Sequence, residues 1–215
     1  MLTVAEIEPY ITQAFAERLE PREFRLVDKR RWIRSTKMPI REIFSIVAVK
    51  GGTYSPRWGI SCGYVPILKS GKFKRQNTDR TIAADLLIDP IDITGQVDPH
   101  TFSFITGADT RVPIKQIAAC ASHFVPLALA DFDRVHDLPA FCRFFQERST
   151  LEYRRFQFFM HVHHRLTGGF VEILLGRLDE GKRQLAAFCA EQGVDYDDRI
   201  LTDCIRKAEN AARGA

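Results

Sequence analysis

No run of apolar residues in this 215-residue sequence approaches the roughly 20 that are needed to cross a bilayer. The first ten residues, MLTVAEIEPY, contain acids where a signal peptide needs a basic patch followed by an apolar run. We therefore expect a soluble, cytoplasmic protein that has no membrane partner.

Strong catalytic and cofactor motifs are also missing. The sequence contains neither a phosphate-cradling loop ending in Gly-Lys-Ser/Thr nor a Gly-x-Gly-x-x-Gly fingerprint. Its five cysteines are scattered and include no CxxC pair, which argues against a disulfide framework and against a Cys-rich zinc module. We expect reduced thiols in the core and no cofactor. The missing motifs favour a binding protein over an enzyme without deciding between them, and an enzyme with an unrecognised site is kept as an alternative.

What the sequence does contain is an uneven distribution of charge. The net charge is +4, yet residues 22–80 hold 15 Lys/Arg and 4 Asp/Glu and so carry +11, whereas the remainder carries −7. A basic surface gathers anions and therefore indicates an acidic partner. The alternative is that the basic strands and the acidic helices neutralise each other within the molecule.

The hydrophobic period predicts the fold class. Ile7, Ile11, Phe15 and Leu19 share one helical face, and we expect that helix to begin near Pro9, because proline is poorly tolerated inside a helix. Residues 22 to about 106 alternate with a period of 2, whereas nearly everything from about residue 111 is helical. This order predicts an α+β protein with an N-terminal helix on a twisted antiparallel sheet, followed by a helical C-terminal half. We expect residues 1–110 and 111–215 to pack as one compact unit.

Local signals predict several turns and helix ends. KSGK, with Gly71, is typical of a hairpin turn, Gly193 of a helix end, and Asp195–Asp198 of a helix start. We also expect Gly168-Gly169 to break a helix, and the first helix to cover the strand face of Gly59, Ser61 and Gly63. The segment LLGRLDEG is similar to the helical hairpins of tetratricopeptide-like arrays, but no second copy follows at a fixed period.

The Trp-containing hairpin and the strand pattern IVAVK…PRWGISCGYV resemble a group of bacterial proteins of unknown function. The resemblance covers at most residues 7 to about 140. It implies an α+β fold with an N-terminal helix and an antiparallel sheet, and it implies no chemistry.

Two basic stretches are the candidate binding residues. KRRWIR and KSGKFKR each place an aromatic residue among cations, a pattern that contacts phosphates and stacks bases in some proteins. Our leading hypothesis is a module that binds an acidic protein through the basic side of the sheet, and the alternative is a nucleic-acid-binding protein that uses the same cations. The residues concerned are Arg31, Trp32, Arg34, Lys72, Phe73, Lys74 and Arg75.

Two further clusters carry weaker signals. His161 and His164 share a helical face, as do Cys120 and His123, so the four could form a zinc site if the two faces met. The H-E-x-x-H signature is absent, and we expect no bound metal. A second cluster offers acid–base or magnesium chemistry, although Asp-Pro dipeptides favour ordinary turns there. It comprises Asp85, Asp89, Asp92, Asp98 and His100.

Overall fold

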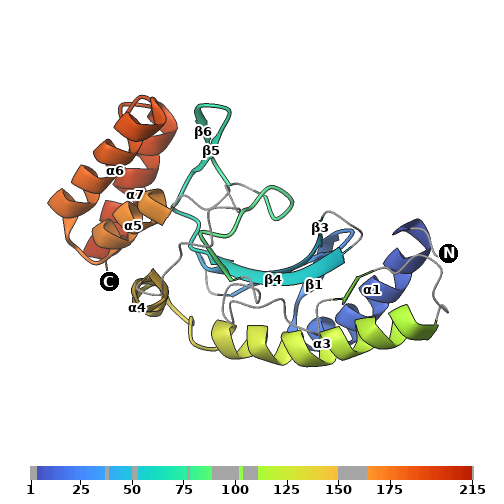
Figure 1. Cartoon of the computed structure of the whole chain (residues 1–215). Coiled ribbons are helices and arrows are strands. Elements are labelled where there is room, and N and C mark those ends of the chain that lie inside the picture. Colours follow the sequence, from blue (N-terminus) through green and yellow to red (C-terminus); the bar gives the residue numbers. More distant parts are fainter. Residues whose placement is uncertain are drawn as a thin grey trace. The chain divides into compact units, whose positions relative to one another are not determined.

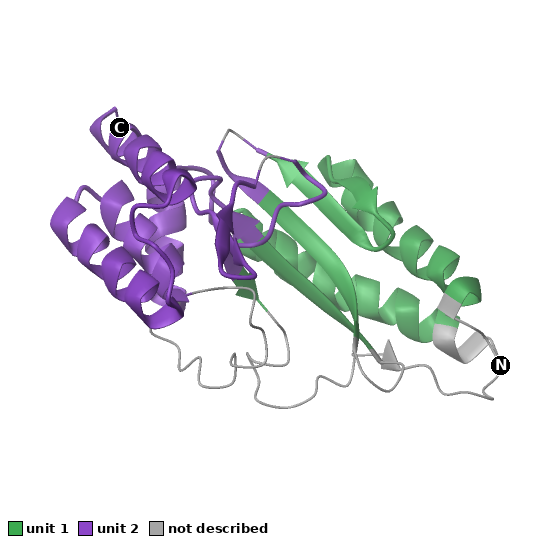
Figure 2. Cartoon of the chain, turned by 90° about the horizontal axis from the view of Figure 1, so that it is seen from above, with its two compact units in different colours: residues 1–35, 42–59, 87–133 green, residues 36–41, 60–86, 134–215 purple. Residues whose placement is uncertain are grey.

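The computed structural model describes residues 4–36, 39–49, 53–76, 78–88, 102–103, 111–149 and 164–214 (Figure 1). The chain divides into two compact units, each drawn from three separate stretches (Figure 2). We call residues 1–35, 42–59 and 87–133 the sheet unit, and residues 36–41, 60–86 and 134–215 the helical unit. The predicted division near residue 110, and the packing of both halves as one unit, stay predictions.

The strands form a mainly antiparallel arrangement that confirms the predicted α+β class. Within the described residues, six strands make one sheet in the order β1-β2-β3-β4-β7, with β8 pairing with β4. β1 and β2 pair antiparallel as the predicted Trp-containing hairpin, with Leu26 opposite Trp32. The strands are β1 Arg25–Asp28, β2 Arg31–Ser35, β3 Arg41–Val49, β4 Thr53–Ser61, β7 Leu86–Ile88 and β8 Phe102–Ser103.

Two helices of the sheet unit, α1 (Val4–Leu19) and α3 (Arg111–Phe132), pack against each other. A one-turn 3-10 helix, η1 (Glu20–Arg22), follows α1. The prediction that α1 begins near Pro9 is wrong, since Pro9 lies inside the helix. A proline costs about 3 kcal/mol there, but burying each of Ile7, Ile11 and Phe15 contributes roughly 1.5–3 kcal/mol, which outweighs that cost.

The core of the sheet unit is aromatic. The ring of Phe15 in α1 lies 5.5 Å from that of Phe44 and 6.0 Å from that of Trp32. Phe44 in turn stacks on Trp58 at 6.5 Å, and Trp58 contacts Phe124 of α3 at 6.5 Å. The first helix therefore covers the bulky face of the sheet and not the glycine face that we expected, because the aromatic side offers far more apolar area to bury.

The helical unit contains a short hairpin and four helices in the described residues. β5 (Ile67–Lys69) and β6 (Lys72–Lys74) pair around a two-residue turn, as KSGK predicted. Ser70 and Gly71 have φ angles of 53° and 70°, which are the left-handed values of a tight hairpin turn. The helices are α4 Leu138–Ser149, α5 His164–Leu174, α6 Leu178–Gln192 and α7 Arg199–Arg213.

Gly168-Gly169 does not break a helix, contrary to the prediction, because both glycines lie within α5. A Cβ built on Gly169 would lie 2.7 Å from the Leu185 side chain, and one on Gly181 would lie 2.6 Å from the Gly169 carbonyl oxygen. The glycines thus let α5 and α6 pack with their backbones close together. This packing is worth more than the roughly 1 kcal/mol that a helical glycine costs.

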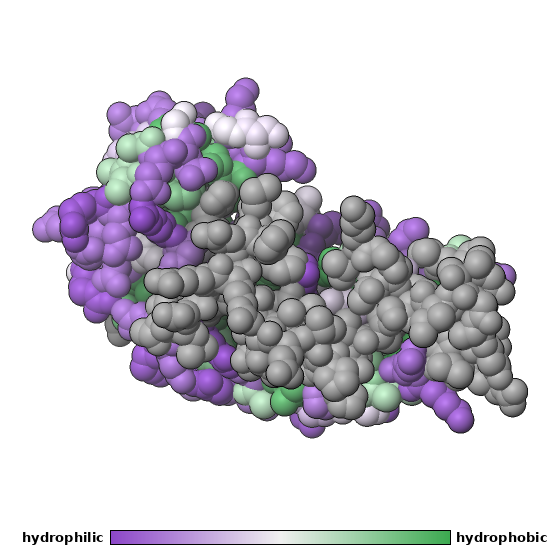
Figure 3. All heavy atoms as spheres, viewed as in Figure 1, coloured by the Kyte–Doolittle hydropathy of each residue, from purple (hydrophilic) through white to green (hydrophobic). Residues whose placement is uncertain are grey.

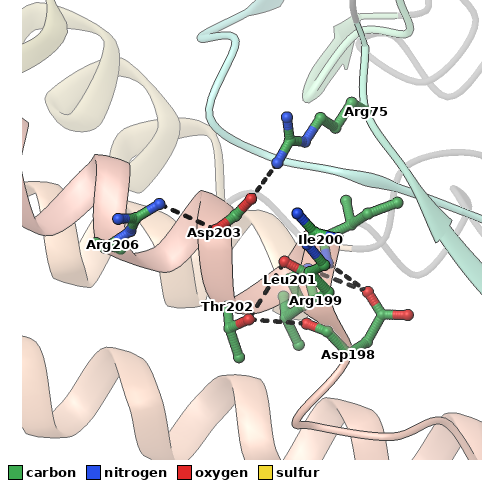
Figure 4. A network of polar contacts seen from close by, with 8 residues as sticks. All are labelled: Arg75, Asp198, Arg199, Ile200, Leu201, Thr202, Asp203 and Arg206. Atoms are coloured by element: carbon green, nitrogen blue, oxygen red, sulfur yellow. Dashed lines mark hydrogen bonds and ion pairs between the residues drawn. The ribbon is translucent and has the colours of Figure 1, made fainter.

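The other predicted helix ends are confirmed. Gly193 ends α6 in the left-handed conformation, with φ of 63°. The Asp198 carboxylate caps α7 by accepting hydrogen bonds from the backbone N–H groups of Ile200 (2.7 Å) and Leu201 (3.3 Å), as Figure 4 shows.

All five cysteines are buried free thiols, as predicted. Burial raises the pKa of Cys142 to about 12, so this thiol stays protonated at neutral pH. No helix in the described ranges is long and apolar enough to cross a bilayer.

Candidate functional site

The predicted binding residues of the sheet unit are buried or already paired with other residues of the fold. Trp32 is fully buried, and Arg31 is half-buried. The Arg34 guanidinium lies 4.9 Å from the centre of the Phe24 ring and pairs with the buried carboxylate of Glu42. Trp32 therefore presents no ring for stacking, and Arg34 already has a carboxylate partner.

The pairing of Arg34 with Glu42 is a structural one. Burial raises the pKa of Glu42, and the hydrogen bond and charge of Arg34 oppose that rise. Arg34 also donates to the carbonyl oxygen of Arg22 at 3.3 Å. The cation thus satisfies the buried carboxylate of Glu42 and a backbone carbonyl of the same unit.

The hairpin of β5 and β6 carries the other predicted binding residues, and its two faces differ. Ile67 pairs with Lys74, Leu68 with Phe73, and Lys69 with Lys72. Because side chains alternate along a strand, Lys69, Lys72 and Lys74 share one face, whereas Phe73 points to the other. All three lysines are exposed and Phe73 is buried. We call Ile67–Lys74 the lysine hairpin and the side of its three lysines the lysine face.

No acidic residue in the described part of the chain forms an ion pair with the lysine face. None of Lys69, Lys72 and Lys74 makes an ion pair or a side-chain hydrogen bond with a described residue. Lys69 and Lys72 lie directly opposite each other, and like charges in that position destabilise a pair of strands. The hairpin therefore concentrates positive charge at a cost to its own stability.

The surface of α6 is charged as well, but its charges are paired. Figure 3 shows hydrophilic side chains gathered over this helix on the side that it draws. Arg183 pairs with Glu180, and the Lys182 Nζ lies 2.6 Å from a carboxylate oxygen of Glu209. Such a surface is typical of an ordinary solvated helix.

Arg75, just after β6, connects the lysine hairpin to α7. Its guanidinium pairs with the carboxylate of Asp203, which also accepts from Arg206 at 3.1 Å (Figure 4). Figure 4 shows Asp203 between the two guanidinium groups. This ion pair fixes the end of the lysine hairpin to α7.

Asp85 is the described member of the predicted acidic cluster. Asp89, Asp92, Asp98 and His100 lie outside the described residues. The Asp85 side chain is buried and accepts hydrogen bonds from Ser61 Oγ (3.0 Å), the Cys62 backbone N–H (2.8 Å) and Gln76 Nε2 (3.2 Å).

Burial raises the pKa of Asp85 to about 6, and the hydrogen bonds from Cys62, Ser61 and Gln76 oppose the rise. The cavity beside the carboxylate, lined also by Thr167, is just large enough to admit one water molecule. This site can exchange a proton near pH 6, but it has no room for an organic substrate.

The sequence also contains a hydrolase-type motif at this site. Gly59–Gly63 reads GISCG and matches Gly-x-Ser-x-Gly, the motif that exposes a nucleophilic serine on a strand-to-helix turn in hydrolases. Here Ser61 ends β4, is fully buried and donates to Asp85, and the next described element is the strand β5. The structural context of a nucleophile elbow is therefore not met.

The candidate metal ligands are spread over both units. Cys120 is buried in α3, and the ring of the neighbouring His123 contacts Phe124. His164 begins α5 and stacks on Phe145 at 5.0 Å, whereas His161 lies outside the described residues. Among the side chains that the structure describes, no three of His, Cys, Asp or Glu are grouped as metal ligands.

Comparison of the chain with protein-family models, with curated proteins and with solved structures finds no match. The resemblance to bacterial α+β proteins of unknown function stays a prediction.

Proposed function

We propose that this protein is a binding module that takes an acidic segment of a protein partner on the lysine face. The observation that supports the proposal is the like-charged pair of Lys69 and Lys72, with Lys74 on the same side and no ion pair from these lysines to an acid among the described residues. A carboxylate-rich segment would supply the missing counter-charge and relieve the repulsion.

The burial of two aromatic residues helps to decide between an acidic protein and a nucleic acid as the partner. Single-stranded nucleic acid is bound through aromatic side chains on which bases stack, together with cations. Trp32 and Phe73, the two rings that suggested such stacking, are buried in the fold. The cations alone favour an acidic protein segment as much as a phosphate backbone, and the burial of the rings removes the specific argument for bases.

The anchoring of the hairpin also supports binding. Phe73 is buried on the opposite side, and Arg75 pairs with Asp203 of α7. These contacts hold the backbone that carries the three lysines in one conformation. Because the hairpin is ordered before binding, less conformational entropy is lost when a partner binds.

The test uses a fluorescent peptide of ten glutamates and a fluorescent DNA duplex, titrated with the protein at about 50 and about 200 mM salt, a range over which phosphate contacts lose much of their affinity. We expect the peptide to bind at the lower salt. In the triple variant Lys69→Glu, Lys72→Glu, Lys74→Glu its affinity should fall at least about tenfold, since each exposed charge pair contributes up to about 1 kcal/mol.

The matched control reverses three exposed cations elsewhere, Lys115→Glu, Arg199→Glu and Lys207→Glu, and so changes the net charge equally. An equal loss of peptide affinity in this control would show that net charge, not the lysine face, governs binding. DNA binding with a steep salt dependence, in the absence of peptide binding, would replace the proposal with the nucleic-acid alternative.

A further inference from the structure

A side-chain hydrogen bond closes the base of the lysine hairpin. Val65 lies two residues before β5, and Gln76 lies two residues after β6. The Gln76 Nε2 donates to the Val65 carbonyl oxygen at 3.0 Å, and both residues are buried. The two chain ends of the hairpin are therefore tied together by one amide side chain.

The same amide nitrogen also donates to Oδ1 of Asp85 at 3.2 Å. Oδ2 of Asp85 accepts from Ser61 and from the Cys62 backbone, at the end of β4. The Asp85 carbonyl oxygen accepts from Thr167 Oγ1 of α5 at 3.2 Å. Asp85 thus joins the base of the hairpin to β4 on one side and to α5 on the other.

Protonation of the Asp85 carboxylate would change its hydrogen bond with Gln76 at Oδ1. Oδ2 accepts from Ser61 and the Cys62 backbone, Oδ1 accepts from Gln76, and the Cys62 thiol also bonds to the carboxylate. We place the added proton on Oδ1, where it would face the Gln76 N–H donor. Gln76 cannot simply turn its amide, because its Oε1 already accepts from the Ala83 backbone N–H. The protonated acid would instead donate toward the adjoining cavity, which admits a water molecule, and Gln76 would lose this acceptor.

The groups that face the Asp85 side chain are mostly neutral. Cys62 faces it from the end of β4 with a thiol, Gln76 from the hairpin base with an amide, and Ser61 with a hydroxyl. From α5, Leu166 and Thr167 line the same cavity. Burial raises the pKa of the Cys62 thiol well above its usual range, so among these groups only Asp85 changes its charge in mildly acidic solution.

We propose that Asp85 and Gln76 form a latch that holds the lysine hairpin at neutral pH and opens when Asp85 takes up a proton. The regulatory meaning of the latch rests on the proposed function, because a loosened hairpin would present its lysines less well to a partner. The latch itself involves no partner, so its test is independent of the binding test.

The test is hydrogen exchange of the full chain, expressed as protection factors corrected for the intrinsic pH dependence of exchange, at about pH 5 and about pH 7.5, on either side of the Asp85 transition. We expect the protection of residues 67–74 to be about fivefold lower at the acidic pH, the factor that the loss of one hydrogen bond gives. The protection of α7 should not fall at the acidic pH, because protonation of the buried Asp85 favours the folded chain as a whole. Gln76→Ala and Asp85→Asn should each abolish the pH dependence in the hairpin, whereas Asp179→Asn, at an exposed aspartate of α6, should retain it.

A second measurement needs no variant. In the wild-type protein, the NMR signals of the Asp85 carboxyl carbon and the Gln76 side-chain amide should change together with one midpoint near pH 6. Hairpin protection that is equal at both pH values, or pH dependence that persists in Gln76→Ala, would overturn the latch. An Asp85 carboxyl that titrates without any change at Gln76 would overturn it as well.

Discussion

The indole Nε1 of Trp58 in β4 donates a 2.8 Å hydrogen bond to the Asp131 carboxylate near the end of α3. Both side chains are buried, so the bond fixes α3 to the sheet at one defined point. The aromatic core provides most of the burial, and this polar contact selects how the helix lies on it.

Removing the acceptor should therefore cost stability. We expect Asp131→Ala to lower the free energy of unfolding by about 1–3 kcal/mol, because it leaves the indole N–H buried without this partner. Urea denaturation followed by tryptophan fluorescence measures the change. The exposed neighbour Asp133 provides the control, since Asp133→Ala should change stability by less than about 0.5 kcal/mol. Equal effects of both variants would contradict the importance of the hydrogen bond.

Asp85 should make stability fall as pH rises. Its pKa is about 6 in the folded chain and lies near 3.8 when unfolded, so the folded state binds the proton more tightly. The stabilisation is fully present below about pH 4 and is lost by about pH 6, with a total of about 3 kcal/mol. We expect urea denaturation at several pH values to show this fall in the wild type relative to Asp85→Asn. A constant difference between the two proteins across that range would contradict the assignment.

The close contact of α5 and α6 should not tolerate a Cβ at Gly181. A Cβ on Gly181 would lie 2.6 Å from both the Gly169 carbonyl oxygen and the Ile173 side chain, so Gly181→Ala should destabilise the protein by about 1–3 kcal/mol. Gly168→Ala is the matched control, because its Cβ would meet nothing nearer than 3.4 Å and alanine favours the helix by about 0.5–1 kcal/mol. Thermal unfolding of the two variants should therefore shift in opposite directions.

The turn of the lysine hairpin can be improved without touching the lysine face. Ser70 has a positive φ of 53°, a conformation that asparagine adopts more readily than serine. We expect Ser70→Asn to raise the protection of the hairpin amides against hydrogen exchange, whereas Gly71→Ala should lower it because of the strained φ of 70°. Peptide binding by Ser70→Asn should be at least as strong as in the wild type, and a loss would argue against the lysine face as the binding surface.

Local sequence signals predicted those features that depend on neighbouring residues. The turn at Gly71, the end of α6 at Gly193 and the cap at Asp198 each involve backbone groups only a few residues away. Their physical cause is therefore contained in a short window of sequence.

The features that sequence reasoning missed depend on distant partners. Gly169 lies inside a helix, where its close contact with Gly181 of the neighbouring helix offsets the cost of a helical glycine. No local sequence pattern shows this contact. Alternation placed Phe73 between two lysines correctly, but it could not tell which face of the hairpin would be covered. Asp85 accepts hydrogen bonds from Ser61 and Cys62, which lie more than 20 residues earlier in the chain, so only the fold brings these groups together.

The division into units has a consequence for synthesis on the ribosome. The stretch 60–86 belongs to the helical unit, yet 129 residues follow Leu86, which at 5–20 residues per second take roughly 6 to 26 s to emerge. The last stretch of the sheet unit ends at Asp133, so that unit can fold while the lysine hairpin still waits for α5, α6 and α7. During that interval Phe73, on the face opposite the lysines, lacks the cover of α7, and we expect the charges of the three lysines to disfavour pairing of the uncovered strands with neighbouring nascent chains.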